Sequence, residues 1–464
     1  MKRTRTKTPA AAPTLLNSPE GELANGIWPK SVAFWFGLGY MALYVIRPWE
    51  ALFPWMMVLR PERTWALATL LAVFLDKRSR LRTDGLTYSM ILLLLVVGLT
   101  VAFSIDRANS WDTFWPFLTM AAFVFMMQAF LTNIYHLSLF ILGYLFILSL
   151  YFSKALWEYF VHGQHRYTMG VIRLSGIEGT FGGPNNLAMT LVVSLPLIYL
   201  LWNHKEYLSA SWPDKWKVRL RRFLKFHIPL TVLALVLTNS RSGFLGFMVF
   251  LLLMWWGRPG FARKAKVMVA CILGLALLWA AIPEANKGRI KTIWEPESGP
   301  ANAQVSAEGR IIGFLVGIEM FQEKPIAGVG YGNYIKYRVE NLDGLALQPH
   351  NLIGQLLGET GILGALGFST FLIVALAGCG KLKRWSKMED GADGEYLKEL
   401  AKAMKSCIIL LFIMGGFGHN FARYNWYWTG AYISASIYGY RAFIASRSKN
   451  ARRLKAGAAE THMS

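Results

Sequence analysis

Long apolar runs constrain this chain more than any other feature of its sequence. Residues 90–103 read MILLLLVVGLTVAF, and residues 244–256 read FLGFMVFLLLMWW. A helix needs about 20 mostly apolar residues to cross a hydrocarbon core about 30 Å thick. Hydrophobic residues make up 54% of the chain and charged residues only 16%, so a soluble domain could not bury this surface. The sequence therefore predicts an all-α polytopic membrane protein.

The apolar segments predict about twelve transmembrane helices. We expect them near residues 31–58, 62–76, 86–104, 112–131, 135–159, 185–202, 226–240, 242–257, 266–283, 351–379, 404–420 and 428–446. The first segment is open to two interpretations, because Arg47-Pro48 could break the helix. One span followed by a re-entrant or interfacial piece agrees with the charges of the later loops, whereas two full spans would invert them.

Basic residues cluster in short loops between the apolar segments, as the positive-inside rule expects. They place both termini in the cytoplasm and two long loops outside, near residues 160–184 and 284–350. The formal net charge of +22 is explained by these loops and by contact with anionic membrane lipids, so we expect no nucleic-acid partner. The first 30 residues lack an early apolar core, and we expect no cleaved signal peptide.

The predicted organisation has five parts. They are a cytoplasmic tail (1–30), a first transmembrane part (31–283), a long periplasmic loop (284–350), a second transmembrane part (351–446) and a cytoplasmic tail (447–464). The long loop contains a helical pattern at residues 309–322. There Ile311, Ile312, Leu315, Ile318 and Phe321 could form one apolar stripe, which predicts an amphipathic helix that lies on the membrane or caps the bundle.

Four polar constellations fall on the predicted outer side. The first is TNSRSGFLG (238–246), a tight turn with Arg241 at its apex between Ser240 and Ser242. The second is EGRIIGF (308–314), where Arg310 is expected to start the amphipathic helix. A guanidinium binds phosphate with two parallel hydrogen bonds, and a helix N-terminus adds free amide donors. Snorkelling to lipid heads remains an alternative for Arg241, and simple solvation remains one for Arg310.

The third constellation is QPHNLIGQLLGETGILG (348–364), where His350 and Asn351 lie at the start of a span. A neutral imidazole is a competent base near pH 7, although a single histidine at a span boundary is more often structural. The fourth is RLSGIEGTFGGPNNLA (173–188). It supplies Arg173, while Asn185 or its neighbour could simply cap the next helix.

A further outer segment, GHNFARYNWYW (418–428), contains His419 and Arg423 beside interfacial aromatic rings. Cys271, Cys379 and Cys407 share no metal-ligand or redox spacing. The chain also contains no HExxH motif. We therefore expect inert thiols, no metal and no cofactor.

Two motifs carry a resemblance to a known family. His350 and Asn351 are followed by nine residues (352–360) and then by Gly361-Ile-Leu-Gly364, and Arg241 is followed after three residues by Leu245. In this order the motifs resemble the O-antigen ligase and polymerase superfamily. The resemblance implies a GT-C-like membrane glycosyltransferase in the bacterial inner membrane, with its active site facing the periplasm.

The resemblance also implies the substrates. The donor would be a glycan on undecaprenyl diphosphate, and the acceptor a hydroxyl of the lipid A-core oligosaccharide. Arg241, Arg310 and Arg173 would contact the diphosphate, and His350 would act as the general base of an inverting transfer. An O-antigen polymerase or a protein O-oligosaccharyltransferase of the same superfamily remains an alternative, as does an anion transporter, which would place its arginines at the bundle midplane.

Overall fold

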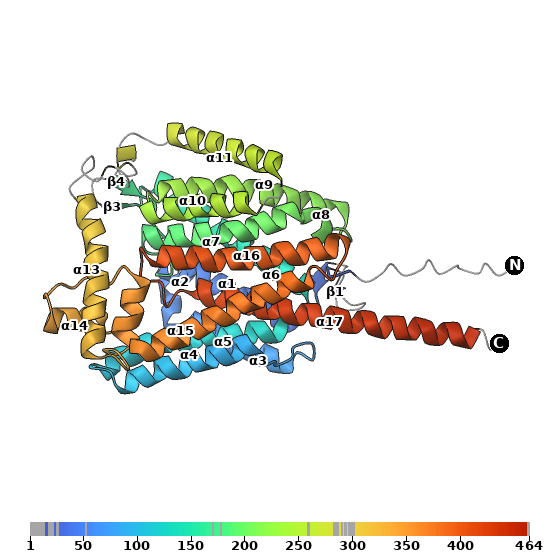
Figure 1. The fold of residues 1–464 in the computed structure, drawn as a ribbon, viewed down its shortest axis with the longest axis horizontal. Helices are drawn as coiled ribbons and strands as arrows, with labels where there is room; N and C mark the ends of the chain where they lie inside the picture. Colours follow the sequence, from blue (N-terminus) through green and yellow to red (C-terminus); the bar gives the residue numbers. More distant parts are fainter. Residues whose placement is uncertain are drawn as a thin grey trace.

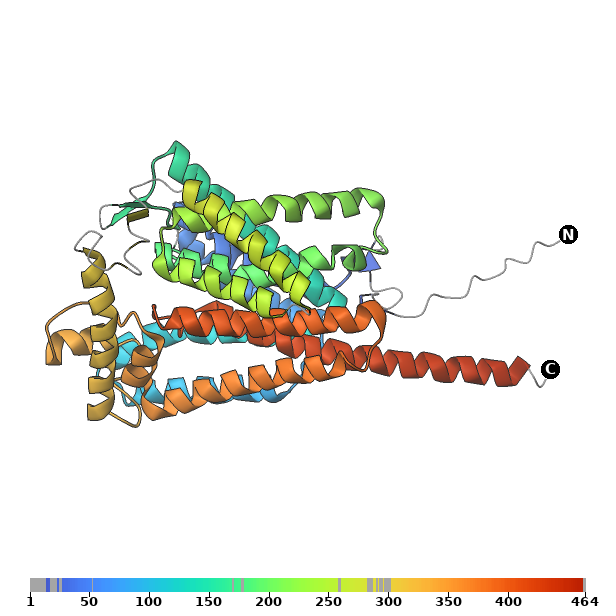
Figure 2. The same cartoon turned by 45° about the horizontal axis from the view of Figure 1, so that its top comes forward.

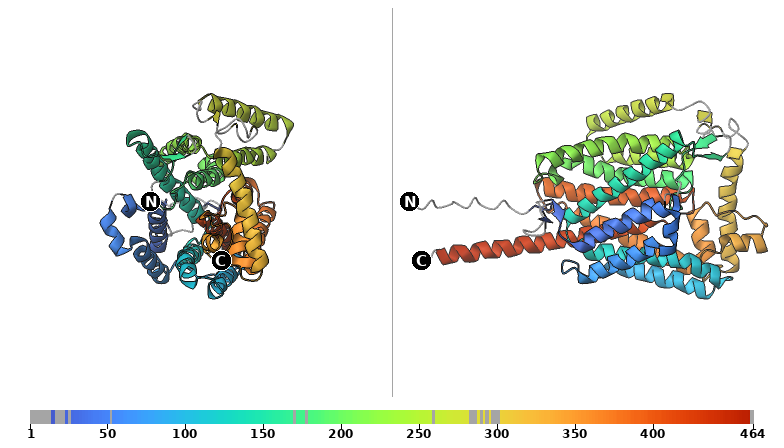
Figure 3. Two further views of the ribbon diagram at one scale, coloured as in Figure 1. Left: turned by 90° about the vertical axis from the view of Figure 1, so that its left-hand side faces the viewer. Right: turned by 180° about the vertical axis from the view of Figure 1, so that it is seen from behind.

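The computed structural model describes residues 14–16, 23–24, 27–51, 53–168, 171–176, 179–257, 260–281 and 302–461, with single residues 287, 288, 291 and 295. Long helices run side by side in one bundle (Figure 1). The hairpin β1–β2 (Leu23–Ala24 and Trp28–Pro29) and the end of α17 (Tyr424–Thr461) lie at one end. Helix α13 (Asn302–Glu323) lies at the opposite end, which we call the α13 end (Figure 3).

The remaining elements follow in chain order. They are α1 (Val32–Ile46), α2 (Pro48–Ala51), η1 (Pro54–Leu59), α3 (Pro61–Leu75), α4 (Gly85–Ala102), α5 (Arg107–Phe130), α6 (Ile134–Val161), β3 (Arg166–Thr168), β4 (Val171–Arg173), α7 (Pro184–Asn203), α8 (Lys205–Leu208), α9 (Asp214–Leu237), α10 (Arg241–Trp256), α11 (Phe261–Ala281), α14 (Tyr334–Asn341), α15 (Leu352–Trp385) and α16 (Gly391–Gly415). Both sheets are two-stranded antiparallel hairpins.

Five helices within the described residues are long and apolar enough to cross a membrane, namely α4, α5, α6, α7 and α15. Helix α10 is apolar but shorter. The chain is therefore a mostly helical, multi-pass membrane protein, as the apolar runs predict. The number of twelve spans, the GT-C-like architecture and the orientation across the membrane stay predictions.

The first apolar segment is broken at Arg47-Pro48, the point that the sequence left open. Helix α1 ends at Ile46, and Arg47 adopts a left-handed conformation with φ of 45°. Proline cannot continue the hydrogen bonding of the preceding helix, and Pro48 begins the short helix α2. Both α2 and η1 are too short to form a span, which confirms the alternative of one helix followed by a short piece.

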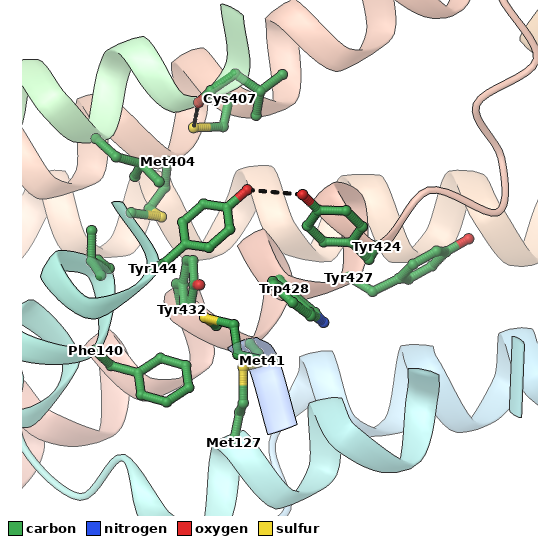
Figure 4. Packing of buried hydrophobic residues seen from close by; sticks show 14 of the residues in the cluster. Met41, Met127, Phe140, Tyr144, Met404, Cys407, Tyr424, Tyr427, Trp428 and Tyr432 are labelled. Atoms are coloured by element: carbon green, nitrogen blue, oxygen red, sulfur yellow. Dashed lines mark hydrogen bonds between the residues drawn. The ribbon is translucent and has the colours of Figure 1, made fainter. Parts of the chain in front are cut away.

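Aromatic side chains fill the centre of the bundle between α1, α6 and α17 (Figure 4). The hydroxyl groups of Tyr144 and Tyr424 lie 3.1 Å apart, so each buried phenol has a hydrogen-bond partner. The Trp428 ring packs against Tyr424, with the ring centroids 4.3 Å apart. This packing fixes the start of α17 and the loop that precedes it at the α13 end.

The predicted helix in the long loop exists as α13, and its apolar stripe lies largely outside the contact with the bundle, as the alternative of a helix on the membrane surface allows. Helix α13 crosses the end of the bundle at a steep angle to the long helices (Figure 2). Ile311 and Leu315 are 63% and 56% exposed. The helix instead packs on α15 through glycines, since a Cβ added at Gly317 would lie 2.3 Å from the carbonyl oxygen of Gly354. Backbone-to-backbone contact, rather than apolar side chains, therefore sets the position of α13.

Helix α15 is interrupted at Gly361, where φ is 60° and ψ is −160°. The loop after α13 fills the interruption. Ile362 donates its N–H to the Pro325 carbonyl at 2.8 Å, and Val329 donates its N–H to the Gly358 carbonyl at 2.9 Å. The loop thus satisfies backbone groups that a break in a helix leaves without partners. This gives the glycine of the predicted motif a geometric role.

Cys379 and Cys407 are buried free thiols. Cys407 donates weakly to the Val193 carbonyl at 3.4 Å. Both positions agree with the prediction of structural thiols, whereas the side chain of Cys271 lies outside the described residues.

Candidate functional site: an arginine-lined cavity at the α13 end

A cavity of about 430 Å³ lies at the α13 end of the bundle. Its walls come from the β3–β4 hairpin, the start of α7, helix α13 and the loops before α15 and α17. We call it the arginine cavity. Its chemically distinctive lining residues are Arg166, Arg173, Asn185, Ser242, Arg310, His350 and His419.

The turn between α9 and α10 is held by local hydrogen bonds and by close packing. Asn239 adopts a left-handed conformation with φ of 46°. Ser240 is the N-cap of α10, because its hydroxyl accepts from the N–H of Gly243 at 3.1 Å. A Cβ at Gly243 would lie 2.7 Å from the Cβ of Ala188, so glycine lets the start of α10 approach α7. Arg241 is thereby fixed at the first position of α10.

Arg173 organises the neighbouring wall. Its side chain is only 5% exposed. Its Nε donates to the Thr238 carbonyl at 2.9 Å, and its Nη2 donates to Asn185 Oδ1 at 2.8 Å. Ser240 Oγ donates to the same oxygen of Asn185 at 2.9 Å. One guanidinium group therefore connects β4, the turn before α10 and the first turn of α7.

These contacts correct the expectation that an asparagine caps α7. The N-cap position belongs to Gly183, without a side-chain cap, and Pro184 opens the helix. The Asn185 side chain is oriented toward Arg173 and Ser240 instead. Its amide oxygen accepts hydrogen bonds from Arg173 and Ser240 and does not cap the helix.

Arg310 does not start its helix, which is a second correction. Helix α13 begins at Asn302, so Arg310 lies in the helix interior and no free amide donors surround it. Burial and, to a smaller extent, the positive charge of nearby Arg241 lower the pKa of Arg310 to about 10. Within the described residues no acidic side chain pairs with Arg310, whose guanidinium lies 5.9 Å from the centroid of the Phe417 ring. Two neighbouring guanidinium charges favour an anion at this point.

His350 and His419 are neighbours in the lining of the cavity, with ring centroids 5.4 Å apart and ring planes tilted by 49°. His350 has a φ of 46°, an uncommon conformation for a residue other than glycine. Burial lowers the pKa of His350, and the charge of Arg310 lowers it as well. Burial lowers the pKa of His419 to about 4, with smaller contributions from His350 and Arg423. Both shifts favour the neutral imidazole.

Asn351 has a structural position directly after His350. Its side-chain oxygen accepts from the N–H groups of Ile353 and Gly354 at 2.9 and 3.0 Å, which caps α15. Its amide nitrogen donates to the Gly416 carbonyl at 3.3 Å. Asn351 thus anchors the backbone that carries His350 to the loop after α16.

The structure brings most of the predicted residues together. Arg241 does not line the cavity itself, although its charge reaches Arg310. Arg423 lies apart from it, on a second cavity, and donates to the Thr180 carbonyl at 2.9 Å. The sequence reasoning missed Arg166, which pairs with Arg173 across the β3–β4 hairpin. Two short β-prone segments around Met169-Gly170 were the available signal for that hairpin.

Metal ligands form no group in the part of the chain that the structure describes. No three histidine, cysteine, aspartate or glutamate side chains gather there. The metal independence of the chemistry stays a prediction from the sequence.

Comparison with known families identifies the central part of the chain. Residues 228–369 match the model of the Wzy_C family, whose description is O-antigen ligase. The matched segment contains Arg241, Arg310, His350 and the interrupted part of α15. No curated protein matches the sequence with significance. The chain therefore contains a segment that matches a Wzy_C domain, and this segment supplies Arg241, Arg310 and His350 of the arginine cavity and its surroundings.

Proposed function

We propose that the protein is an O-antigen ligase. It would transfer a glycan from undecaprenyl diphosphate to a hydroxyl group of the lipid A-core oligosaccharide, at the periplasmic face of the bacterial inner membrane. The observation that carries the proposal is the arginine cavity, which combines Arg310 and a neutral His350 in one space within a Wzy_C domain. In such a pair, the arginine would bind a diphosphate and the histidine would accept the proton of an attacking hydroxyl.

The arginines act on the leaving group. As the bond between the glycosyl carbon and the phosphate oxygen breaks, negative charge grows on the diphosphate. Arg310 and Arg241 stabilise this charge, and Arg173 keeps the wall that holds Arg241 in position. Removing one preorganised donor of this kind typically lowers the rate about 10²–10³-fold. The diphosphate is already a weak base, so the leaving group needs no general acid.

His350 acts on the nucleophile. It accepts the proton of the acceptor hydroxyl while the hydroxyl oxygen forms the new glycosidic bond, and undecaprenyl diphosphate departs. One displacement of this kind inverts the anomeric configuration. Burial and the charge of Arg310 lower the pKa of His350, which favours the neutral imidazole that a general base requires. Asn351 positions His350 by capping α15.

The location of the charges separates this proposal from a transporter. Arg310 and Arg241 lie at the α13 end of the bundle rather than halfway along its helices. A charged site at one end suits an enzyme that receives its substrates from one side of the membrane. Neither ATP nor a metal takes part in the proposed reaction.

A transfer assay with purified protein tests the proposal. Undecaprenyl-diphosphate-linked glycan and rough lipopolysaccharide are incubated with the protein, and a ladder of longer lipopolysaccharide is expected on a gel. His350→Ala should abolish the ladder and retain donor binding, whereas Arg310→Ala should weaken both. His162→Ala is the control, because His162 is exposed and pairs only with Glu158 outside the cavity.

Three results would contradict the proposal. Glycan lengthening without lipopolysaccharide would indicate a polymerase, and transfer to a protein would indicate a protein O-oligosaccharyltransferase. Undiminished transfer by His350→Ala would remove His350 as the base.

A further inference from the structure

A second and larger cavity, of about 1060 Å³, lies beside the arginine cavity. One part of this cavity is lined by α3 and α5, and we call this part the slot. One face of each helix lines the slot, with Ala66 and Leu70 on α3 and Leu118, Ala122 and Met126 on α5. Leu70 is 39% exposed at the surface of the bundle. The slot is therefore apolar and open at the side, where a lipid chain could enter from the membrane.

Other lining residues of this cavity contribute buried polar atoms that have no hydrogen-bond partner among the described residues. Arg47 Nε, Gln355 Oε1 and His419 Nδ1 are buried and have no hydrogen-bond partner among the described residues. All three residues line the cavity. Unsatisfied buried polar atoms are costly and uncommon in folded proteins. A ligand rich in hydroxyl groups would satisfy all three atoms, because a hydroxyl both donates and accepts.

The opening of the cavity carries unbalanced positive charge. Arg47 has two acidic partners, since its guanidinium lies 2.8 Å from Glu50 and 3.5 Å from Glu62, so the three arginines Arg47, Arg60 and Arg63 exceed these two carboxylates by one positive charge. Arg60 and Arg63 also line the cavity and are exposed. Neither has an acidic partner within the described residues; Arg63 lies over the Trp115 ring at 6.0 Å. Two exposed guanidinium groups above an apolar slot match a lipid with a phosphorylated head group.

The two cavities meet at His419. Of the described lining residues, His419 alone belongs to both. The loop from Gly179 to Gly183 also contributes to both, because Gly179 and Thr180 line the second cavity and Gly183 lines the arginine cavity. Arg423 donates to the Thr180 carbonyl in this loop. On the arginine-cavity side, His419 neighbours His350, with 5.4 Å between the ring centroids. A head group bound in the second cavity would thus extend toward His350.

We propose that the second cavity binds the acceptor, a phosphorylated glycolipid. Its acyl chains occupy the slot between α3 and α5, its phosphates bind Arg60 and Arg63, and its sugars bind Arg47, Gln355 and His419. A sugar hydroxyl then passes His419 and reaches His350, while the donor diphosphate remains in the arginine cavity. This inference rests on the proposed function, since it assigns the second substrate of the same reaction.

A binding experiment without donor tests the inference. The full-length protein is placed in nanodiscs and titrated with fluorescently labelled rough lipopolysaccharide. Leu70→Trp fills the slot and is expected to weaken binding at least tenfold. Leu71→Trp is the matched control, because Leu71 is on the same helix, is 58% exposed and does not line the cavity. Its affinity should stay within twofold of the wild type.

Charge reversal tests the phosphate contacts separately. Arg60→Glu combined with Arg63→Glu should weaken binding of the phosphorylated acceptor at least tenfold, and enzymatic removal of the lipid A phosphates should abolish this difference. Arg107→Glu is the control, because Arg107 is exposed at the start of α5 and lies outside the cavity. An equal loss in Arg107→Glu would indicate a general surface-charge effect and would overturn the phosphate assignment.

The outcomes distinguish this inference from the proposed function. If Leu70→Trp binds acceptor as the wild type does, the assignment of the cavity is wrong, even if transfer occurs. If Leu70→Trp instead loses binding of undecaprenyl-diphosphate-linked glycan, the cavity belongs to the donor and the inference is also wrong. Cavity-dependent acceptor binding without any transfer would support the inference and refute the proposed catalysis.

Discussion

The glycine contact between α13 and α15 provides a test of how the site is positioned. An alanine Cβ at Gly317 would lie 2.3 Å from the Gly354 carbonyl oxygen. Ordinary contacts of such a carbon begin near 3.4 Å, so the two backbones must separate by about 1 Å. Arg310 is seven residues before Gly317, on the same face of α13, and His350 is four residues before Gly354. The separation would therefore move Arg310 away from His350.

The expected cost follows from the size of this movement. A misplacement of about 1 Å in an active site can lower the rate about 10²-fold, which corresponds to about 2.7 kcal/mol of transition-state stabilisation. Overpacking of a tight interface also costs about 1–3 kcal/mol of stability. Gly317→Ala should therefore remain folded in detergent, with a lowered melting temperature and a rate of transfer reduced about 10²-fold.

Gly309→Ala is the matched control for this experiment. It adds the same methyl group to the same helix, next to Arg310, but nothing lies within 4 Å of the added carbon. The rate of glycan transfer is measured by gel for both variants and the wild type, after thermal unfolding has confirmed that each is folded. The argument would be refuted if Gly317→Ala transferred glycan at the wild-type rate, or if Gly309→Ala lost as much.

Three further predictions concern the same region. The rate of transfer should fall as the pH decreases through an apparent pKa below about 6.5, because protonation of His350 removes the base. Arg310→Met removes a positive charge that lowers the pKa of His350, so the acid limb of the pH–rate profile should move to higher pH. An acid limb that does not move would argue against this effect of Arg310 on His350. Arg173→Lys cannot reproduce both hydrogen bonds to Thr238 and Asn185, so we expect a loss of about 1–3 kcal/mol in the free energy of unfolding, together with weaker donor binding; unchanged melting would refute the structural role. Gly361→Ala should lower the melting temperature more than Gly391→Ala: both glycines have positive φ, but only the Cβ at Gly361 would approach another backbone, at 2.4 Å from the Ile326 carbonyl oxygen. Equal losses of melting temperature would mean that the positive φ alone, and not the contact with Ile326, destabilises the Gly361→Ala variant.

The sequence by itself determined the class of the protein and indicated its family. Apolar runs of membrane-spanning length leave a chain no soluble alternative, because the backbone of each run must satisfy its own hydrogen bonds inside lipid. The motif of His350 and Gly361, and the arginine of the TNSRSG turn, indicated the family, which the Wzy_C match over residues 228–369 confirms. These features are local, so they can be recognised without knowledge of which helices meet.

Tertiary structure decided how these residues are arranged. Local periodicity predicted an apolar stripe on α13 and left open whether the helix lies on the membrane or caps the bundle. Gly317 and Gly354 make the close contact between α13 and α15, and the hydrophobicity of neither helix encodes this backbone proximity. The sequence likewise did not predict that α13 begins at Asn302, that Asn185 contacts Arg173, or that Arg166 lines the arginine cavity. Each of these depends on contacts between distant segments. The second cavity depends on α3, α5 and the loop of His419, three segments far apart in the chain. Sequence patterns report on neighbours along one helix, whereas a cavity is formed by side chains that only folding brings together.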